Sequence, residues 1–160
     1  MVRLERVLNT ILVKDLATSR DFYVALAGFE VVYQSDWYIV LSPPGQPLTQ
    51  LGLIDQVSEF APRHAWGVHQ GTYLTLVVDD VVEALHRARR LDVEIIEEPV
   101  ALAYGQTRAL IRDPNGLVID LSTPTKHLGG AAPNLLAADR LVAIDQQQAE
   151  DRDGPKPVTP

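Results

Sequence analysis

The stretch RDPNGLVIDL, from Arg112 to Leu121, combines a strong turn signal with apolar runs on both sides. Leu110 and Ile111 end the first run. The segment Asp113 to Gly116 supplies the turn, because Pro fixes φ and Asn and Gly tolerate positive φ. The second run contains Asp120, a carboxylate that is costly to bury unless something pairs with it. The stretch therefore predicts strand, tight turn and strand, with Asp120 either lining a pocket or facing water at a strand end.

Composition indicates one acidic domain. A length of 160 residues favours a single domain, with or without a tail, and 46% hydrophobic residues are ample for a core. The net charge of −7 and the lack of a basic cluster argue against nucleic acid and anionic membranes as partners. With no cysteine, there is neither a disulfide framework nor a thiolate metal site. Without a signal-peptide pattern or an 18-residue apolar run, we expect a cytoplasmic protein with no membrane segment.

Outward from the closing turn, the same order of elements occurs twice. In the first half, residues 7–13, 29–34, 37–41 and 48–54 read as strands, and a helix capped by Thr18 or Ser19 runs to about residue 27. Gly28 is placed as the C′ residue of that helix. In the second half, the strands are expected over residues 72–78, 93–97, 107–111 and 117–121, with a helix from Asp79 or Asp80 through Leu91. Each half thus predicts strand, helix and three strands.

The two halves also match in residue type. Val13-Lys14-Asp15 falls on Val78-Asp79-Asp80 at an offset of 65, and Phe29 to Val32 falls on Val93 to Ile96 at an offset of 64. A repeat of this size indicates an internal duplication, with residues 56–71 as the connector.

Beyond Thr123 the composition changes. The main domain is expected over 1–124, with modules at about 5–55 and 72–124, followed by a partly helical C-terminal extension over 125–160. Residues 135–148 can form a helix, and 151–160 are polar and proline-rich. The extension is either a surface helix with a disordered end or an arm that docks on a partner subunit.

The segments VKDLATSRDFYVALAGFEVV and RDPNGLVIDL resemble the vicinal oxygen chelate superfamily, which includes glyoxalase I, extradiol dioxygenases, and fosfomycin- and bleomycin-resistance proteins. The resemblance covers about residues 5–124 and is greatest to the metal-free bleomycin-resistance type. It implies an α+β fold in which two βαβββ modules form a pair of curved half-barrels around a concave cavity, with the helices on the convex faces. It also implies a homodimer, because relatives commonly pair modules between chains.

In metal-using members of the family, His and Glu side chains from both modules hold a divalent ion. The resemblance carries these four positions to Leu8, Gln50, Tyr73 and Asp120. Leu offers no donor atom, and Gln and Tyr are poor substitutes for His and Glu. The four histidines lie elsewhere, at His64, His69, His86 and His127. We therefore expect no metal and no other cofactor.

A metal-free cavity of this kind would bind an organic ligand between apolar walls and a few polar groups. The candidate ligand-binding residues are Thr10, Trp37, Tyr38, Gln50, Tyr73, Thr75, Tyr104, Arg108 and Asp120. Each has a plainer alternative: Trp37 can be core, Tyr73 can fill the space of the metal, and Arg108 can lie on the surface. Trp66 can either close the mouth of the cavity or plug the base of the fold.

The first functional hypothesis is a non-catalytic protein that sequesters a small aromatic or antibiotic-like molecule, as in antibiotic resistance. The acidic net charge favours a neutral or cationic ligand. The second is an enzyme of the same fold, a metal-dependent lyase, isomerase or dioxygenase, or one that uses Asp120 and Tyr73 for acid–base chemistry. The third is a regulatory subunit with a vestigial cavity.

Overall fold

The computed structural model describes residues 1–128 of the chain. Its helices are α1 (Leu16–Ala27) and α2 (Val81–Arg90), with short 3₁₀ turns at Arg63–Ala65 and Thr125–His127. Its strands are β1 (Leu8–Val13), β2 (Glu30–Gln34), β3 (Tyr38–Ser42), β4 (Gln50–Asp55), β5 (Leu74–Val77), β6 (Ile95–Ala101), β7 (Gln106–Arg112) and β8 (Val118–Pro124). The predicted order of elements is confirmed in both halves. The helix expected over residues 135–148 lies outside the described part.

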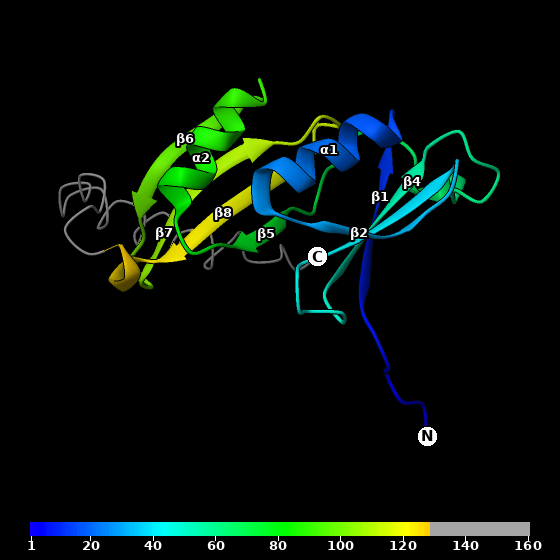
Figure 1. Ribbon diagram of the computed structural model, residues 1–160, viewed down its shortest axis with the longest axis horizontal. Helices are drawn as coiled ribbons and strands as arrows, with labels where there is room; N and C mark the ends of the chain where they lie inside the picture. Colours follow the sequence, from blue (N-terminus) through cyan, green and yellow to red (C-terminus); the bar gives the residue numbers. More distant parts are fainter. Residues whose placement is uncertain (129–160) are drawn as a thin grey trace, which may run out of the picture.

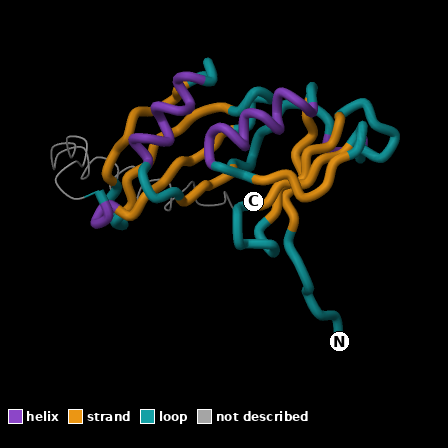
Figure 2. The backbone as a smooth tube through the Cα atoms, in the orientation of Figure 1, coloured by secondary structure: helices purple, strands orange, loops and turns teal. Residues whose placement is uncertain are grey.

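The strands form two four-stranded sheets with the same topology, β1-β4-β3-β2 in sheet A and β5-β8-β7-β6 in sheet B (Figure 1). In each sheet the first and last strands of the module pair in parallel, and the other pairs are antiparallel. The predicted α+β architecture of two βαβββ modules is therefore confirmed. Each sheet is an open, curved layer with its helix on one face (Figure 2).

The helix ends follow from local hydrogen bonds. The Asp15 carboxylate accepts from the amide of Thr18 at 2.6 Å, so Asp15 is the N-cap of α1 and the expectation of a cap at Thr18 or Ser19 was wrong. Gly28 ends α1 at φ 71°, as predicted. Asp80 caps α2 by accepting from the amides of Val82 and Glu83. Neither helix is long and apolar enough to cross a membrane.

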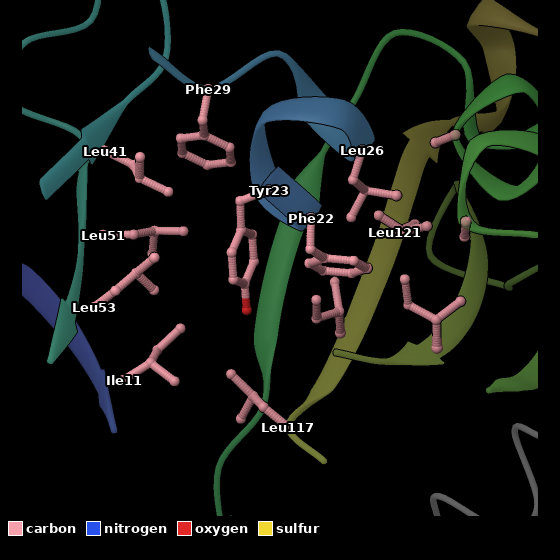
Figure 3. Packing of buried hydrophobic residues seen from close by; sticks show 14 of the residues in the cluster. Ile11, Phe22, Tyr23, Leu26, Phe29, Leu41, Leu51, Leu53, Leu117 and Leu121 are labelled. Atoms are coloured by element: carbon pink, nitrogen blue, oxygen red, sulfur yellow. The ribbon is translucent and has the colours of Figure 1, made fainter. Parts of the chain in front are cut away.

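One hydrophobic core joins the two modules. Helix α1 contributes to both sides of it: Tyr23 lies beside Leu51 and Leu53 of β4, whereas Leu26 lies toward Leu121 of β8 (Figure 3). All five side chains are buried. Because α1 packs on its own sheet and toward sheet B, the modules of one chain share their interior.

The D-P-N-G turn between β7 and β8 fastens the second module to α1. The buried carboxylate of Asp113 accepts a hydrogen bond from the Tyr23 hydroxyl at 2.8 Å and from the amides of Asn115 and Leu117 at 2.8 and 2.9 Å. The Asn115 side chain donates to the Ser19 hydroxyl and accepts from the amide of Lys14. The D-P-N-G turn, which the sequence identified between two strands, thus forms polar contacts between the two modules in addition to their shared core.

The Tyr23–Asp113 contact makes stability fall at alkaline pH. Burial first, and then the charge of Asp113 and the hydrogen bond to it, hold the pKa of Tyr23 well above its usual value of 10.0. Since the folded pKa exceeds the unfolded one, this contribution is complete below about pH 10 and is lost as the pH rises further, by up to about 1.4 kcal/mol per pH unit. Tyr23→Phe should therefore show a shallower loss of unfolding free energy above pH 10 in urea titrations. The control is Tyr33→Phe, which removes an exposed tyrosine and should keep the wild-type dependence on pH. If unfolding free energy falls equally steeply with pH in wild type and Tyr23→Phe, the prediction is wrong.

Candidate functional site

The face of each sheet that turns away from the helices is partly exposed: Tyr33 is exposed, whereas Asp120 and Ser122 are buried. Side chains alternate along the strands, and those of one set lie in the core. The other set in sheet A forms face 1, which includes Thr10, Tyr33, Tyr38, Val40, Gln50 and Gly52. The other set in sheet B, with Tyr73 just before β5 and Tyr104 from the β6–β7 loop, forms face 2, which includes Thr75, Arg108, Leu110, Asp120 and Ser122.

Face 1 is aromatic along one side. The rings of Tyr33 and Tyr38 have centroids 6.2 Å apart, and Trp37 stacks on Tyr38 at 5.5 Å with 25° between the planes. Trp37 also contacts Phe60 of the connector, with centroids 4.6 Å apart. Tyr33 is 52% exposed and Phe60 is 60% exposed. This aromatic row, defined as Tyr33, Tyr38, Trp37 and Phe60, offers flat apolar surface to a ligand.

Gly52 makes room for two polar groups at the centre of face 1. It lies between Thr10 of β1 and Val40 of β3. A Cβ atom at this position would lie 2.7 Å from the Tyr38 hydroxyl oxygen and 2.9 Å from Thr10 Oγ1. The two hydroxyl groups therefore converge over the backbone of Gly52. The side-chain oxygen of Gln50, at the start of β4, accepts from the Arg6 guanidinium at 2.9 Å.

Filling the space over Gly52 should destabilise the protein and displace Tyr38. In Gly52→Ala the new methyl group forces the Tyr38 ring or the Thr10 side chain to move, and overpacking of this kind typically costs about 1–3 kcal/mol. We expect a lower urea midpoint and a changed Trp37 emission, because Trp37 stacks on Tyr38. Gly45→Ala is a control of a different kind: it has open space but a φ of 71°, so it should cost stability without altering Trp37 emission. Unchanged stability and emission in Gly52→Ala would disprove the close approach.

Face 2 is more polar and centres on Asp120. This carboxylate is only 5% exposed and accepts a hydrogen bond from the Ser122 hydroxyl. Asp120 is therefore buried with a partner, and the alternative of a strand-end residue facing water is wrong. The pKa of Tyr104 is raised, mainly by partial burial. The positive charge of Arg108 lowers this pKa, whereas the charges of Asp120 and Tyr73 raise it, so Tyr104 lies near all three residues. With Thr75, five of the predicted ligand-binding residues thus lie on or beside face 2.

Arg108 has unused hydrogen-bonding capacity on face 2. Its Nη2 atom lies 3.4 Å from a carboxylate oxygen of Glu97 on β6. Its Nε atom is buried and donates to no described residue, and the buried side-chain oxygen of Gln106 accepts from none. A buried donor or acceptor that lacks a partner is costly, so a partner that the described residues do not supply would stabilise both atoms once their side chains shift to expose them.

The residues present do not fit the divalent metal of the superfamily. The sheets pair Thr10 with Gly52 and Thr75 with Asp120, so the first-module counterpart of Asp120 is Gly52. The expectation of Gln50 at that position was wrong, because the pairing of β1 with β4 places Gly52, two residues after Gln50, at the position equivalent to Asp120. The resulting set, Leu8, Gly52, Tyr73 and Asp120, offers one carboxylate. Among residues 1–128 no group of three or more His, Asp or Glu side chains could hold a metal ion.

The structure separates the predicted site residues into three groups. Thr10, Tyr38 and Gln50 lie on face 1, and Tyr73, Thr75, Tyr104, Arg108 and Asp120 lie on or beside face 2. Trp37 lies just before β3, between Tyr38 and Phe60, and Trp66 lies in the connector beside the outer edge of β1. Sequence reasoning missed Tyr33, Phe60 and Ser122. Ser122 could have been found, because it is two residues beyond Asp120 on the same strand face.

Residues 3–121 match the family model of the Glyoxalase/Bleomycin resistance protein/Dioxygenase superfamily, and the chain belongs to this superfamily. None of the curated proteins matches the chain.

Solved structures share this fold over most of their length. An integron cassette protein from the mobile metagenome of Vibrio cholerae is 25% identical, with a TM-score of 0.60, and the match covers 77% of this chain and 97% of that one. A superfamily member from Sphaerobacter thermophilus is 26% identical, with a TM-score of 0.60 and coverage of 76% and 98%. TioX from Micromonospora is 17% identical, with a TM-score of 0.61 and coverage of 75% and 98%, which shows a common fold.

Proposed function

We propose that this chain binds and sequesters a small, planar aromatic molecule, neutral or cationic, without a metal ion. The observation that carries the proposal is the aromatic row on face 1, which is partly exposed in the single chain. Ring stacking on such a row contributes on the order of 1 kcal/mol per ring beyond area burial. The net charge of −7 and the carboxylates of Glu97 and Asp120 favour a ligand that is not anionic.

Polar groups on face 2 would orient the ligand. Arg108 Nε is a donor and the Gln106 side-chain oxygen an acceptor that no described residue uses, and a shift of these side chains would bring both buried atoms to the ligand. Tyr73 and Tyr104, which are 60% and 59% exposed, add two more rings. A site built from an aromatic wall and a polar wall has the composition typical of small-molecule pockets.

The proposed binding unit is a homodimer. Each chain leaves both faces open, and isolated open faces would bury only one side of a ligand. A second copy that placed face 2 against face 1 of the first would enclose the ligand and cover the exposed rings. Light scattering after size exclusion tests this proposal: a mass near 35 kDa supports the dimer, and 17.6 kDa at micromolar concentration argues against it.

Fluorescence of Trp37 tests ligand binding directly. A Trp66→Phe variant leaves Trp37 as the single tryptophan of the chain, beside Tyr38. We expect saturable quenching by some members of a panel of planar aromatic compounds, with dissociation constants in the micromolar range or lower (roughly −8 kcal/mol). Matched aliphatic compounds of equal charge should leave the emission unchanged. Emission that no aromatic compound in a broad panel quenches would contradict the proposal.

A further inference from the structure

A groove of about 330 Å³ runs along the outer edge of β5, on the side opposite β8. Its walls come from three elements: the C-terminal end of α1 with Leu26 and Phe29, the β3–β4 loop with Gln46, and the start of α2 with Ala84. We call this the β5 edge groove. The Val78 amide donates to the Ser122 carbonyl of β8. Because backbone groups alternate in direction along a strand, the amides and carbonyls of Val77 and Asp79 point the other way, into the groove.

The equivalent edge in the first module is covered. On β1, His69 of the connector donates to the carbonyl of Leu12 at 3.1 Å, and Asn115 accepts from the amide of Lys14 at 3.0 Å. At the offset of 65 residues, these backbone groups correspond to the carbonyl of Val77 and the amide of Asp79. Within residues 1–128, neither of those two groups has a hydrogen-bond partner. Sheet edges of this kind are normally covered.

Two residues of α2 are smaller than their counterparts in α1, and one of them, Ala84, lines the groove. Ser19 and Tyr23 of α1 bind the D-P-N-G turn, but the corresponding residues of α2 are Ala84 and Ala88. The β7–β8 turn is hydrogen-bonded to Ser19 and Tyr23 of α1. The alanines at the corresponding positions of α2 cannot form such hydrogen bonds with the β3–β4 loop. The duplication predicts a covering segment. In the first module, the segment after the last strand supplies one of the two covering contacts, that of His69 with the carbonyl of Leu12.

We propose that the β5 edge groove is the docking site of the chain's own C-terminal extension. In the first module, the connector leaves β4 at Asp55, contacts the β2–β3 hairpin through Phe60, and reaches β1 at His69. After β8, the chain begins in the same way, because the amide of Thr125 donates to the carbonyl of Gly105 in the β6–β7 hairpin at 2.8 Å.

Chain length and chemistry both fit this occupant. His69 lies 14 residues after Asp55, and the counterpart of Asp55 in β8 is Thr123, so the same length of chain ends at Ala137. Leu135 and Leu136 stand at this place in the sequence, and the apolar lining of the groove includes the exposed Val77 beside the buried Leu26 and Phe29. The extension continues to residue 160, so it is long enough to reach the groove.

Disulfide trapping tests the proposal in the 160-residue chain, which contains no cysteine. Gln46→Cys, on the exposed groove wall, is combined with a single Cys at each position from 133 to 139. We expect mild oxidation to form intrachain disulfides at one or more of these positions. Glu98→Cys on β6, the opposite edge of sheet B, is the matched control and should form none. No trapping, equal trapping to both sites, or disulfides between chains would overturn the assignment.

Hydrogen exchange provides a test that needs no disulfide. If the extension covers the groove, the amides of Val77 and Asp79 should exchange slowly in the unsubstituted 160-residue chain. Replacing Leu135 and Leu136 by Asp should then accelerate their exchange at least tenfold, while the Lys14 amide, which is bonded to Asn115, stays unchanged. Fast exchange at Val77 and Asp79 in the unsubstituted chain, or no acceleration in the variant, would refute the docking.

Discussion

Asp113→Ala should be among the most destabilising single substitutions in this chain. It removes the acceptor for three groups at the junction of the modules: the Tyr23 hydroxyl and the amides of Asn115 and Leu117. Each buried donor left without a partner costs about 1–3 kcal/mol, and because such costs are not additive we expect a total of about 3–4 kcal/mol. That is a large share of the roughly 5–15 kcal/mol that stabilises a typical domain.

Urea unfolding measures this loss against matched variants. Asp113→Asn keeps an acceptor oxygen for the backbone amides and should lose less than Asp113→Ala. Asp21→Ala removes a carboxylate whose contact is an exposed ion pair with Arg20 at 2.8 Å, and pairs of this kind contribute about 0–1 kcal/mol. If Asp113→Ala costs no more than Asp21→Ala, the turn does not fasten the two modules.

Tyr38→Ala should weaken ligand binding about tenfold or more. Tyr38 lies at the middle of the aromatic row, in contact with both Tyr33 and Trp37, and its hydroxyl lies over Gly52. Removing the ring takes away stacking and apolar contact with the ligand, which is worth on the order of 1–2 kcal/mol. Tyr38→Phe keeps the ring and should retain most of the affinity.

Calorimetric titration is the appropriate measurement here, because Trp37 emission itself depends on the Tyr38 ring. Trp66→Phe is the matched aromatic control, since Trp66 lies beside β1 and the connector, away from the aromatic row. A urea midpoint for each variant separates lost binding from lost folding. Equal affinities for wild type and Tyr38→Ala would place the ligand elsewhere.

The fold could be predicted from the sequence because its signals are local. Turn residues at 113–116, a C′ glycine at Gly28 and the duplicated order of elements each constrain a short segment. The errors were also local. Thr18 is not the N-cap of α1, because Asp15 accepts from the Thr18 amide and the helix therefore begins before Thr18. Strand β6 extends through Pro99 to Ala101, because an edge strand tolerates a proline.

The site was only partly predictable because its parts are far apart in sequence. Alternation along β8 places Asp120 on a face, but the register that pairs it with Thr75, and pairs Gly52 with Thr10, depends on the parallel contacts of each sheet. Phe60 joins the aromatic row from a connector with no periodic pattern. The β5 edge groove is lined by Ala84, where α1 has Ser19 at the corresponding position, and this difference is visible only when the two modules are compared in space.

The measurement that tests the central claim most directly is calorimetric titration of one aromatic ligand into protein stripped of metal by a chelator. It is then repeated after addition of Zn²⁺, Ni²⁺ or Fe²⁺. Because the two faces offer a single carboxylate at the four positions that hold the ion elsewhere in the superfamily, we expect one site per chain and the same dissociation constant in every titration. Binding that appears only after metal is added, together with stoichiometric metal in the purified protein, would contradict the account.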